Sequence, residues 1–257
     1  ELASIEEIPS NVVDGAIITS SSLTPKVEPD LPLYHVTARY KDGATRTDPH
    51  SEALHIECGL IVHGAGRRPN IYQLQLEQGE VEYSKHGITV NEYLQSTSNP
   101  HVYAAGDCSA SPGLPLTPLA GLEGRIAATN MLQGHSEKAE YAEIPSVAFT
   151  MPRLATVGIS EEEARKLGDQ ISIRTYDMSS WYTYKRTGEE QALAKIILDK
   201  QKRTVLGAHL LSGEADDLIN HFAVAIKLKL TVDQLKSVIY AYPTTASDLG
   251  YMIKLEE

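Results

Sequence analysis

An apolar run that ends abruptly in a polar turn constrains the fold of this chain more than any other feature. Residues 102–105 read Val-Tyr-Ala-Ala, without the alternation of a half-exposed strand, and Gly106 and Asp107 follow at once. Such a run is typical of a strand covered on both faces, as in a parallel α/β sheet. Ligands of these sheets bind just beyond the carboxyl ends of the strands. Asp107 is therefore a candidate ligand-binding residue, although Gly-Asp is also an ordinary turn.

Size and charge narrow the classes of function. The chain has 257 residues, of which 42% are hydrophobic and 22% charged, as in a globular protein with two or three subdomains. The formal net charge of −11 argues against a nucleic-acid partner, because nucleic acid selects basic surfaces. No stretch approaches membrane-spanning length, and the nine histidines lack metal-binding spacing. We therefore expect neither a membrane partner nor a metal site.

The cysteines and the first residues indicate the redox compartment. Cys58 and Cys108 lie far apart in the sequence and form no paired motif, which disfavours a structural disulfide. The opening "ELASIEEIPS" has neither the basic start nor the apolar run of a secretory signal. We expect a cytoplasmic protein with reduced thiols.

Local patterns predict the secondary structure of the first 142 residues. Alternation over 33–40 and an apolar run over 53–62 predict two strands, and a short strand is expected at 87–90. Thr117 and Pro118 open a helix, with Thr117 placed to cap the free amides, and Gly134 is a suitable stop.

The pattern changes after residue 142, where we predict an α+β unit: a mostly antiparallel sheet with helices on one face. Ser160 with Glu163, and Thr231 with Gln234, are capping boxes that open two helices. A further helix begins near Glu214, and "DKQKR" is typical of a hairpin turn. The predicted strands span residues 146–150, 171–177, 192–198 and 204–211.

Five segments in one fixed order identify a family. They are "HGAGRRPN" (63–70), "STSNPHVYAAGDCS" (96–109), "LTPLAGLEGRIAATNML" (116–132), "IPSVAFTMPRLATVGISEEEA" (144–164) and "YPTTASDL" (242–249). The series resembles the class I pyridine nucleotide–disulfide oxidoreductases, the group of glutathione reductase, dihydrolipoamide dehydrogenase and mercuric reductase. The resemblance implies an α/β fold made of three parts. Residues 1–70 would be the C-terminal part of an NAD(P)-binding domain, 71–141 the C-terminal segment of an FAD-binding domain, and 142–257 the interface domain of a homodimer.

The resemblance also assigns site residues. Asp107 would bind the ribityl hydroxyls of FAD, as an acceptor-only carboxylate can, and Gly106 would let the backbone approach the cofactor. The backbone amide of Thr117, next to Pro118, would face the pyrimidine edge of the flavin. Gly66 and Arg67 would lie where the NAD(P) and FAD domains meet, with Arg67 able to pair with phosphate or carboxylate.

Two departures from the family pattern bear on the reaction. The chain contains neither the two GxGxxG loops nor the CxxxxC redox pair, so we expect it to be the C-terminal portion of a longer enzyme. Where the family has His-Pro-Thr-x-x-Glu, this chain has Tyr242 in place of the His and Ser247 in place of the Glu. A tyrosine with a pKa of about 10 cannot shuttle protons near neutral pH as an imidazole does. Tyr242 is thus a candidate catalytic residue or a packing residue at the dimer interface.

Three functions remain open at this point. The leading hypothesis is FAD-dependent oxidation of NAD(P)H, with an unidentified small-molecule acceptor: a disulfide, a metal or a quinone-like compound. Mercury has less support, because the chain carries no C-terminal cysteine pair. The alternatives are a non-catalytic dimerisation module and a flavin transhydrogenase without dithiol chemistry. The aromatic residues of 179–190, namely Trp181, Tyr182 and Tyr184, are expected to fill the interface sheet rather than edge a binding surface.

Overall fold

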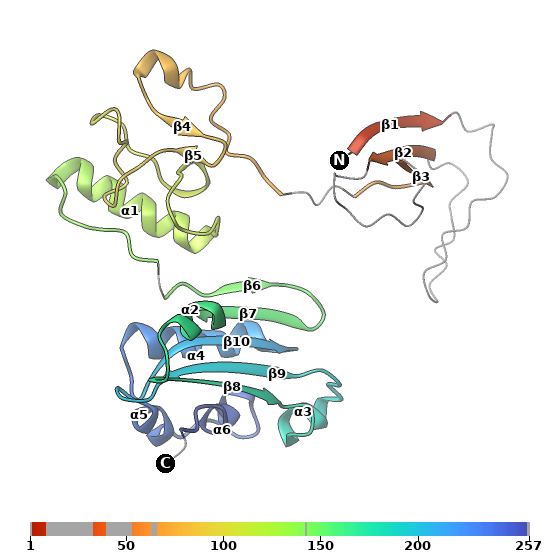
Figure 1. The fold of residues 1–257 in the computed structure, drawn as a ribbon, viewed down its shortest axis with the longest axis vertical. Helices are drawn as coiled ribbons and strands as arrows, with labels where there is room; N and C mark the ends of the chain where they lie inside the picture. Colours follow the sequence, from red (N-terminus) through yellow and green to blue (C-terminus); the bar gives the residue numbers. More distant parts are fainter. Residues whose placement is uncertain (1, 9–32, 40–52, 63–65, 142, 256–257) are drawn as a thin grey trace. The chain divides into compact units, whose positions relative to one another are not determined.

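The computed structural model of the chain describes residues 2–8, 33–39, 53–62, 66–141 and 143–255 (Figure 1). By its internal contacts the chain divides into two compact units, 1–67 and 68–257. None of the helices in the described ranges is long and apolar enough to cross a membrane.

The first unit contains one antiparallel sheet of three strands, in the order β1 (Leu2–Ile8), β2 (Leu33–Arg39) and β3 (Ala53–Cys58). Val36 of the central strand lies opposite Ile5 on one side and Ile56 on the other. The strands predicted near 33–40 and 53–62 are confirmed, whereas β1 was not predicted because its sequence lacks a clear alternation. Residues 63–65 of the glycine–arginine segment lie outside the described residues.

Residues 68–141 form a small layer around a single long helix, α1 (Thr117–Gln133). Short elements precede it: the 3₁₀ helix η1 (Leu76–Gly79), the paired strands β4 (Tyr83–Ser84) and β5 (Gly87–Ile88), and the 3₁₀ helix η2 (Gly106–Cys108). One cluster of buried side chains gathers Ile71, Leu76, Val81, Ile88 and Ala104. A second packs Leu94 against Ile126 and Ala127 of α1.

The predicted parallel strand over 102–105 is wrong. Tyr103 makes one isolated antiparallel bridge with Gln95. The Ser96 amide donates to the Val102 carbonyl at 2.8 Å, and the Ala104 amide donates to the Leu94 carbonyl at 3.0 Å. A parallel ladder needs a parallel neighbour, but here residues 94–96 lie beside the run in the opposite direction. The run is still partly covered, and Ala104 is buried.

Helix α1 begins and ends close to the predicted limits, but its cap differs. Thr117 is the first helical residue, Leu116 precedes it in an extended conformation, and no side chain caps the first turn. The prediction that Thr117 caps the helix is therefore wrong, because a capping residue must stand before the first helical residue. Gly134 ends the helix with a φ of 76°, as predicted.

Residues 143–255 contain a five-stranded antiparallel sheet, which confirms the predicted architecture (Figure 1). Every neighbouring pair is antiparallel, and the 199–203 turn joins β9 to β10 as a hairpin. Strand β7 was not predicted. The order across the sheet is β6 (Ser146–Ala148), β7 (Arg153–Gly158), β10 (Thr204–Ser212), β9 (Leu193–Asp199) and β8 (Ile171–Asp177).

Helices cover both faces of this sheet, which corrects the prediction of one covered face. The larger core lies under α4 (Ala215–Lys227), α5 (Val232–Ser237) and α6 (Leu249–Met252), and includes Ile196 and Leu198 of β9. The other face carries α2 (Glu161–Lys166), whose Ala164 packs with Ile171 and Ile197. Because Ile196, Ile197 and Leu198 are all fully buried, both faces of β9 are covered at this point.

Local capping fixes the helix starts in this part. The Ser160–Glu163 and Thr231–Gln234 capping boxes are both formed, as predicted, and they open α2 and α5. A third box, Thr244 with Ser247, opens the 3₁₀ helix η3 (Thr245–Asp248).

Candidate functional site

Gly106 occupies a position that only glycine suits. Its φ is 67°, in the left-handed region, and a Cβ on it would lie 2.9 Å from the Cβ of Ala120. Ala120 belongs to the first turn of α1, so the close approach brings η2 directly onto the start of the helix. Both the conformation and the crowding therefore call for glycine here.

Asp107 and Thr117 lie at the same end of α1. Asp107 follows Gly106 in η2 with an exposed side chain, and Thr117 precedes Ala120 by three residues, one turn of helix. No described residue accepts a hydrogen bond from the Thr117 amide or donates one to the Asp107 carboxylate. The structure thus places the carboxylate of Asp107 and the free helix-start amide of Thr117, two of the predicted site residues, at the same end of α1. Pro118 is the second helical residue and has no amide hydrogen to offer.

Glu123 holds this turn in place, and the sequence analysis missed it. Its side chain is 1% exposed. One oxygen, Oε2, accepts a hydrogen bond from the Gly106 amide at 2.6 Å. The other, Oε1, accepts from the Ser111 hydroxyl at 2.7 Å and from the Tyr141 hydroxyl at 2.9 Å. Burial raises the pKa of Tyr141 to about 12, so that phenol stays protonated and remains a donor.

A signal for Glu123 was present in the sequence. The buried residues of α1 include Leu119, Glu123, Ile126 and Asn130, at the three- and four-residue spacing of one helix face. A carboxylate on the buried face of a helix is rare, since a buried charge is costly unless it is hydrogen-bonded.

Gly66 and Arg67 belong to the first unit, as its last two residues. Gly66 has a φ of 82° with open space around it, so its conformation alone favours glycine. Both residues are exposed.

Tyr242 lies in an exposed segment that leads into η3. Its side chain is 71% exposed and its ring stacks on Tyr182. Tyr242, Tyr240 and Ser247 contribute to the wall of a pocket of about 250 Å³. Ser247, in the place of the family's Glu, donates its hydroxyl to the Thr244 carbonyl at 2.6 Å. No described hydrogen bond links Tyr242 to Ser247, so the two do not form an acid–base pair.

Trp181, Tyr182 and Tyr184 do not fill the sheet, which corrects the expectation from the sequence. They introduce a helix, α3 (Tyr182–Thr187), that was not predicted. Tyr184 is fully buried and Trp181 packs against the same core, whereas Tyr182 is 60% exposed.

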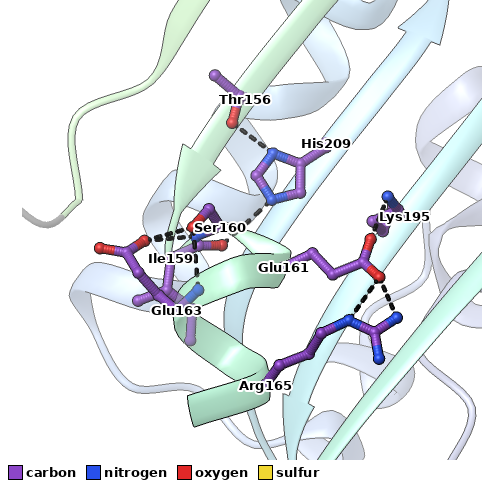
Figure 2. A network of polar contacts seen from close by, with 8 residues as sticks. All are labelled: Thr156, Ile159, Ser160, Glu161, Glu163, Arg165, Lys195 and His209. Carbon is purple, nitrogen blue, oxygen red and sulfur yellow. Dashed lines mark hydrogen bonds and ion pairs between the residues drawn. The ribbon is translucent and has the colours of Figure 1, made fainter.

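A separate polar network lies between α2 and the sheet (Figure 2). The Thr156 hydroxyl donates to Nδ1 of His209 at 2.5 Å, and Nε2 of His209 donates to the Ile159 carbonyl at 3.1 Å. Burial lowers the pKa of His209, which keeps the ring neutral. Hydrogen bonds from Lys195 and Arg165 lower the pKa of the Glu161 carboxyl. Since both ring nitrogens of His209 are engaged, this network is structural.

Comparison with known proteins identifies the family of this chain. The dimerisation-domain profile of the pyridine nucleotide-disulphide oxidoreductases matches residues 144–253, and the pyridine nucleotide-disulphide oxidoreductase profile matches residues 28–130. The chain belongs to the pyridine nucleotide-disulphide oxidoreductase family. The resemblance seen in the sequence is thereby confirmed, and the curated enzymes that match are named as oxidoreductases, a mercuric reductase and a dihydrolipoyl dehydrogenase.

Three curated relatives illustrate the match. An uncharacterised 19.7 kDa protein in a mercuric resistance operon of Staphylococcus aureus is 52% identical over 180 residues, covering 70% of this chain and all of that protein. Mercuric reductase of Staphylococcus aureus is 33% identical over 76% of this chain and 35% of the enzyme. Dihydrolipoyl dehydrogenase of Bacillus subtilis is 31% identical over 79% of this chain and 43% of the enzyme. The chain thus spans less than half the length of both enzymes.

Solved structures agree on the fold. LpdA of Mycobacterium tuberculosis matches with a TM-score of 0.70 at 21% identity, over 86% of this chain and 45% of that one. The HOCl-induced flavoprotein disulfide reductase RclA of Escherichia coli matches with a TM-score of 0.68 at 22% identity, over 87% and 48%. The predicted fold class is confirmed, whereas the three domain limits and the site residues stay predictions.

Proposed function

We propose that this chain is the C-terminal portion of an FAD-dependent NAD(P)H oxidoreductase with a small-molecule acceptor. The observation that carries the proposal is the Gly106–Asp107 turn seated on the first turn of α1. When bound, FAD would supply hydride transfer from the nicotinamide and onward reduction of the acceptor.

The residues at this turn fit the ribityl–flavin part of FAD. Asp107 offers an exposed, acceptor-only carboxylate for ribityl hydroxyls. Thr117 offers a free amide to an acceptor on the pyrimidine edge, and the positive end of a 17-residue helix favours negative charge there by roughly 0.3–1 kcal/mol. Gly106 keeps the backbone free of a side chain at the point of approach. Gly66 and Arg67 would stand at the meeting of the NAD(P) and FAD domains, with Arg67 as the partner of a phosphate or carboxylate.

The surroundings of Tyr242 bear on which class of electron acceptor the enzyme would use. Ser247 is bonded within its own capping box, so no general acid–base pair of the glutathione-reductase kind supports a thiol interchange. Tyr242 and the adjoining pocket instead offer an aromatic ring and hydroxyls to an acceptor. Mercuric ion is the first metal substrate to test, because two relatives are named for mercuric reduction or mercuric resistance.

Flavin content and NAD(P)H oxidation of the purified full-length enzyme that contains this chain test the proposal together. We expect bound flavin in the absorption spectrum and steady oxidation of NADH or NADPH with at least one disulfide, quinone, oxygen or mercuric acceptor. The matched pair Asp107→Asn and Asp107→Ala should both lower flavin content, with the alanine variant lower. Absence of flavin, and of oxidation with all four acceptor classes, would overturn it.

A non-catalytic dimerisation module is the second candidate, and one observation favours it. Residues 144–253 match a dimerisation domain and carry exposed apolar side chains, among them Val224, Leu228, Val238 and Ile239, the last 97% exposed. Large apolar side chains that are this exposed fit a surface that a partner covers. Both candidate functions include a homodimer formed through residues 142–257. Sedimentation of the protein as a monomer would argue against the dimerisation module.

A further inference from the structure

Glu123 is a buried carboxylate without a cation. Its three hydrogen bonds come from a backbone amide and two hydroxyls, and within the described residues no Lys, Arg or His forms an ion pair with it. Burying a charge in this way is costly unless every oxygen is well bonded. Removing such a group leaves its hydrogen-bond donors unsatisfied, so the segments that carry those donors are destabilised.

Those segments are the turn that carries Asp107 and the chain on either side of α1. Gly106, Ser111 and Tyr141 all donate to the one carboxylate. Ala120, one helical turn before Glu123, contacts Gly106 from the same side of the helix. The turn is therefore held at two points, by a packing contact and by a charge-assisted hydrogen bond.

We propose that Glu123 is the positioning residue of the flavin site: its carboxylate fixes the Gly106 turn so that Asp107 is presented beside the start of α1. This inference rests on the proposed function. Glu123 itself lies buried behind the turn, so it acts through Gly106 and Asp107 rather than by contact with the cofactor. No other described side chain bonds to the Gly106 amide, which makes Glu123 the residue on which the position of Asp107 depends.

A set of matched variants separates positioning from general stability. Glu123→Ala removes the acceptor, whereas Glu123→Gln keeps an oxygen for the Gly106 amide and offers an NH₂ to the hydroxyls of Ser111 or Tyr141. Asn130→Ala is the control, because Asn130 is also buried on α1 but accepts from the amides of Ser136 and Glu137, away from the turn.

Two readouts are needed. Binding of FAD is followed by quenching of its fluorescence, and hydrogen exchange of peptides covering 106–111 reports the turn without flavin. We expect Glu123→Ala to weaken FAD binding about tenfold, the effect of losing one buried charged hydrogen bond. Exchange over 106–111 should rise in the same variant. Glu123→Gln should recover most of the affinity, and Asn130→Ala should leave both readouts close to wild type.

The outcomes distinguish this inference from the proposed function. If the wild-type protein and Glu123→Ala bind FAD equally, the inference is wrong and the proposed function stands. If the full-length wild-type protein, in which all these variants are made, binds no FAD, the proposed function fails and the inference falls with it. Should Glu123→Ala not fold, Ser111→Ala and Tyr141→Phe remove one donor each. Their expected losses are about twofold to fivefold, and unchanged affinity in both would overturn the inference.

Discussion

Tyr182 of α3 stacks on Tyr242, with ring centroids 6.1 Å apart and an interplanar angle of 15°. Both rings are largely exposed, so the pair is held by its own contact rather than by a surrounding core. The stack links α3, which the sequence did not predict, to the segment in which a tyrosine stands in place of the family's histidine.

The stacking should be measurable as a coupling between the two rings. Tyr182→Ala should destabilise the protein modestly, and a double-mutant cycle with Tyr242→Ala should give a coupling of about 0.5–1 kcal/mol. Tyr182→Phe keeps the ring and is the control. Urea unfolding of the four proteins in the cycle measures the coupling, and a value near zero would show that the rings do not stabilise each other.

Gly106→Ala tests the close approach of the turn to α1. A side chain at a φ of 67° costs about 1–2 kcal/mol, and the added Cβ meets Ala120 as well. Gly188→Ala is the matched control, since Gly188 also has a positive φ, 74°, but no atom within 4 Å of its Cβ position. We expect Gly106→Ala to lower the free energy of unfolding more than Gly188→Ala. Equal losses would mean that the contact with Ala120 carries no weight.

His209 should make the free energy of unfolding decrease as the pH is lowered through a defined window. Burial lowers its pKa in the folded protein, while the unfolded chain takes up a proton near pH 6.5. Stability is therefore complete above about pH 6.5, decreases as the pH falls toward the folded pKa, and loses nothing further from this group below it. Urea midpoints between pH 7.5 and 5 follow the loss. His209→Gln should remove this part of the dependence, and an unchanged profile would contradict the assignment.

The Thr231 cap offers a test of the local structure. Its hydroxyl accepts from the Gln234 amide at 3.2 Å at the start of α5. Thr231→Ala should cost about 1 kcal/mol in the free energy of unfolding, whereas Thr231→Ser keeps the hydroxyl and should stay close to wild type. Thermal or urea unfolding compares them, and equal stability of the alanine and serine variants would argue against the cap.

Features that depend on neighbours in sequence were predictable. The two capping boxes and the 199–203 hairpin each need only a few consecutive residues, and all three are present. Asp107 and Thr117 were predicted as site residues from the order of motifs, and they lie at the same end of α1 because η2 packs on α1.

Features that depend on partners distant in the sequence could not be predicted. The run at 102–105 has the composition of a covered strand, yet its neighbour, 94–96, runs antiparallel, which composition does not encode. Helix α3 has no side-chain cap, and tyrosine and threonine favour helices only weakly, so its burial of Tyr184 decides the structure. The partners of Glu123 come from two separate stretches of chain, 106–111 and Tyr141, and no local pattern brings them together with Glu123.

The bonds to Glu123 also have a consequence for how the protein opens. Gly106 and Ser111 lie before Glu123 in the chain and Tyr141 lies after it, so one side chain closes two consecutive loops of the backbone at the same point. Neither loop can be released without disturbing the other. We expect the segment from Gly106 to Tyr141 to open as a single cooperative unit instead of fraying from its ends.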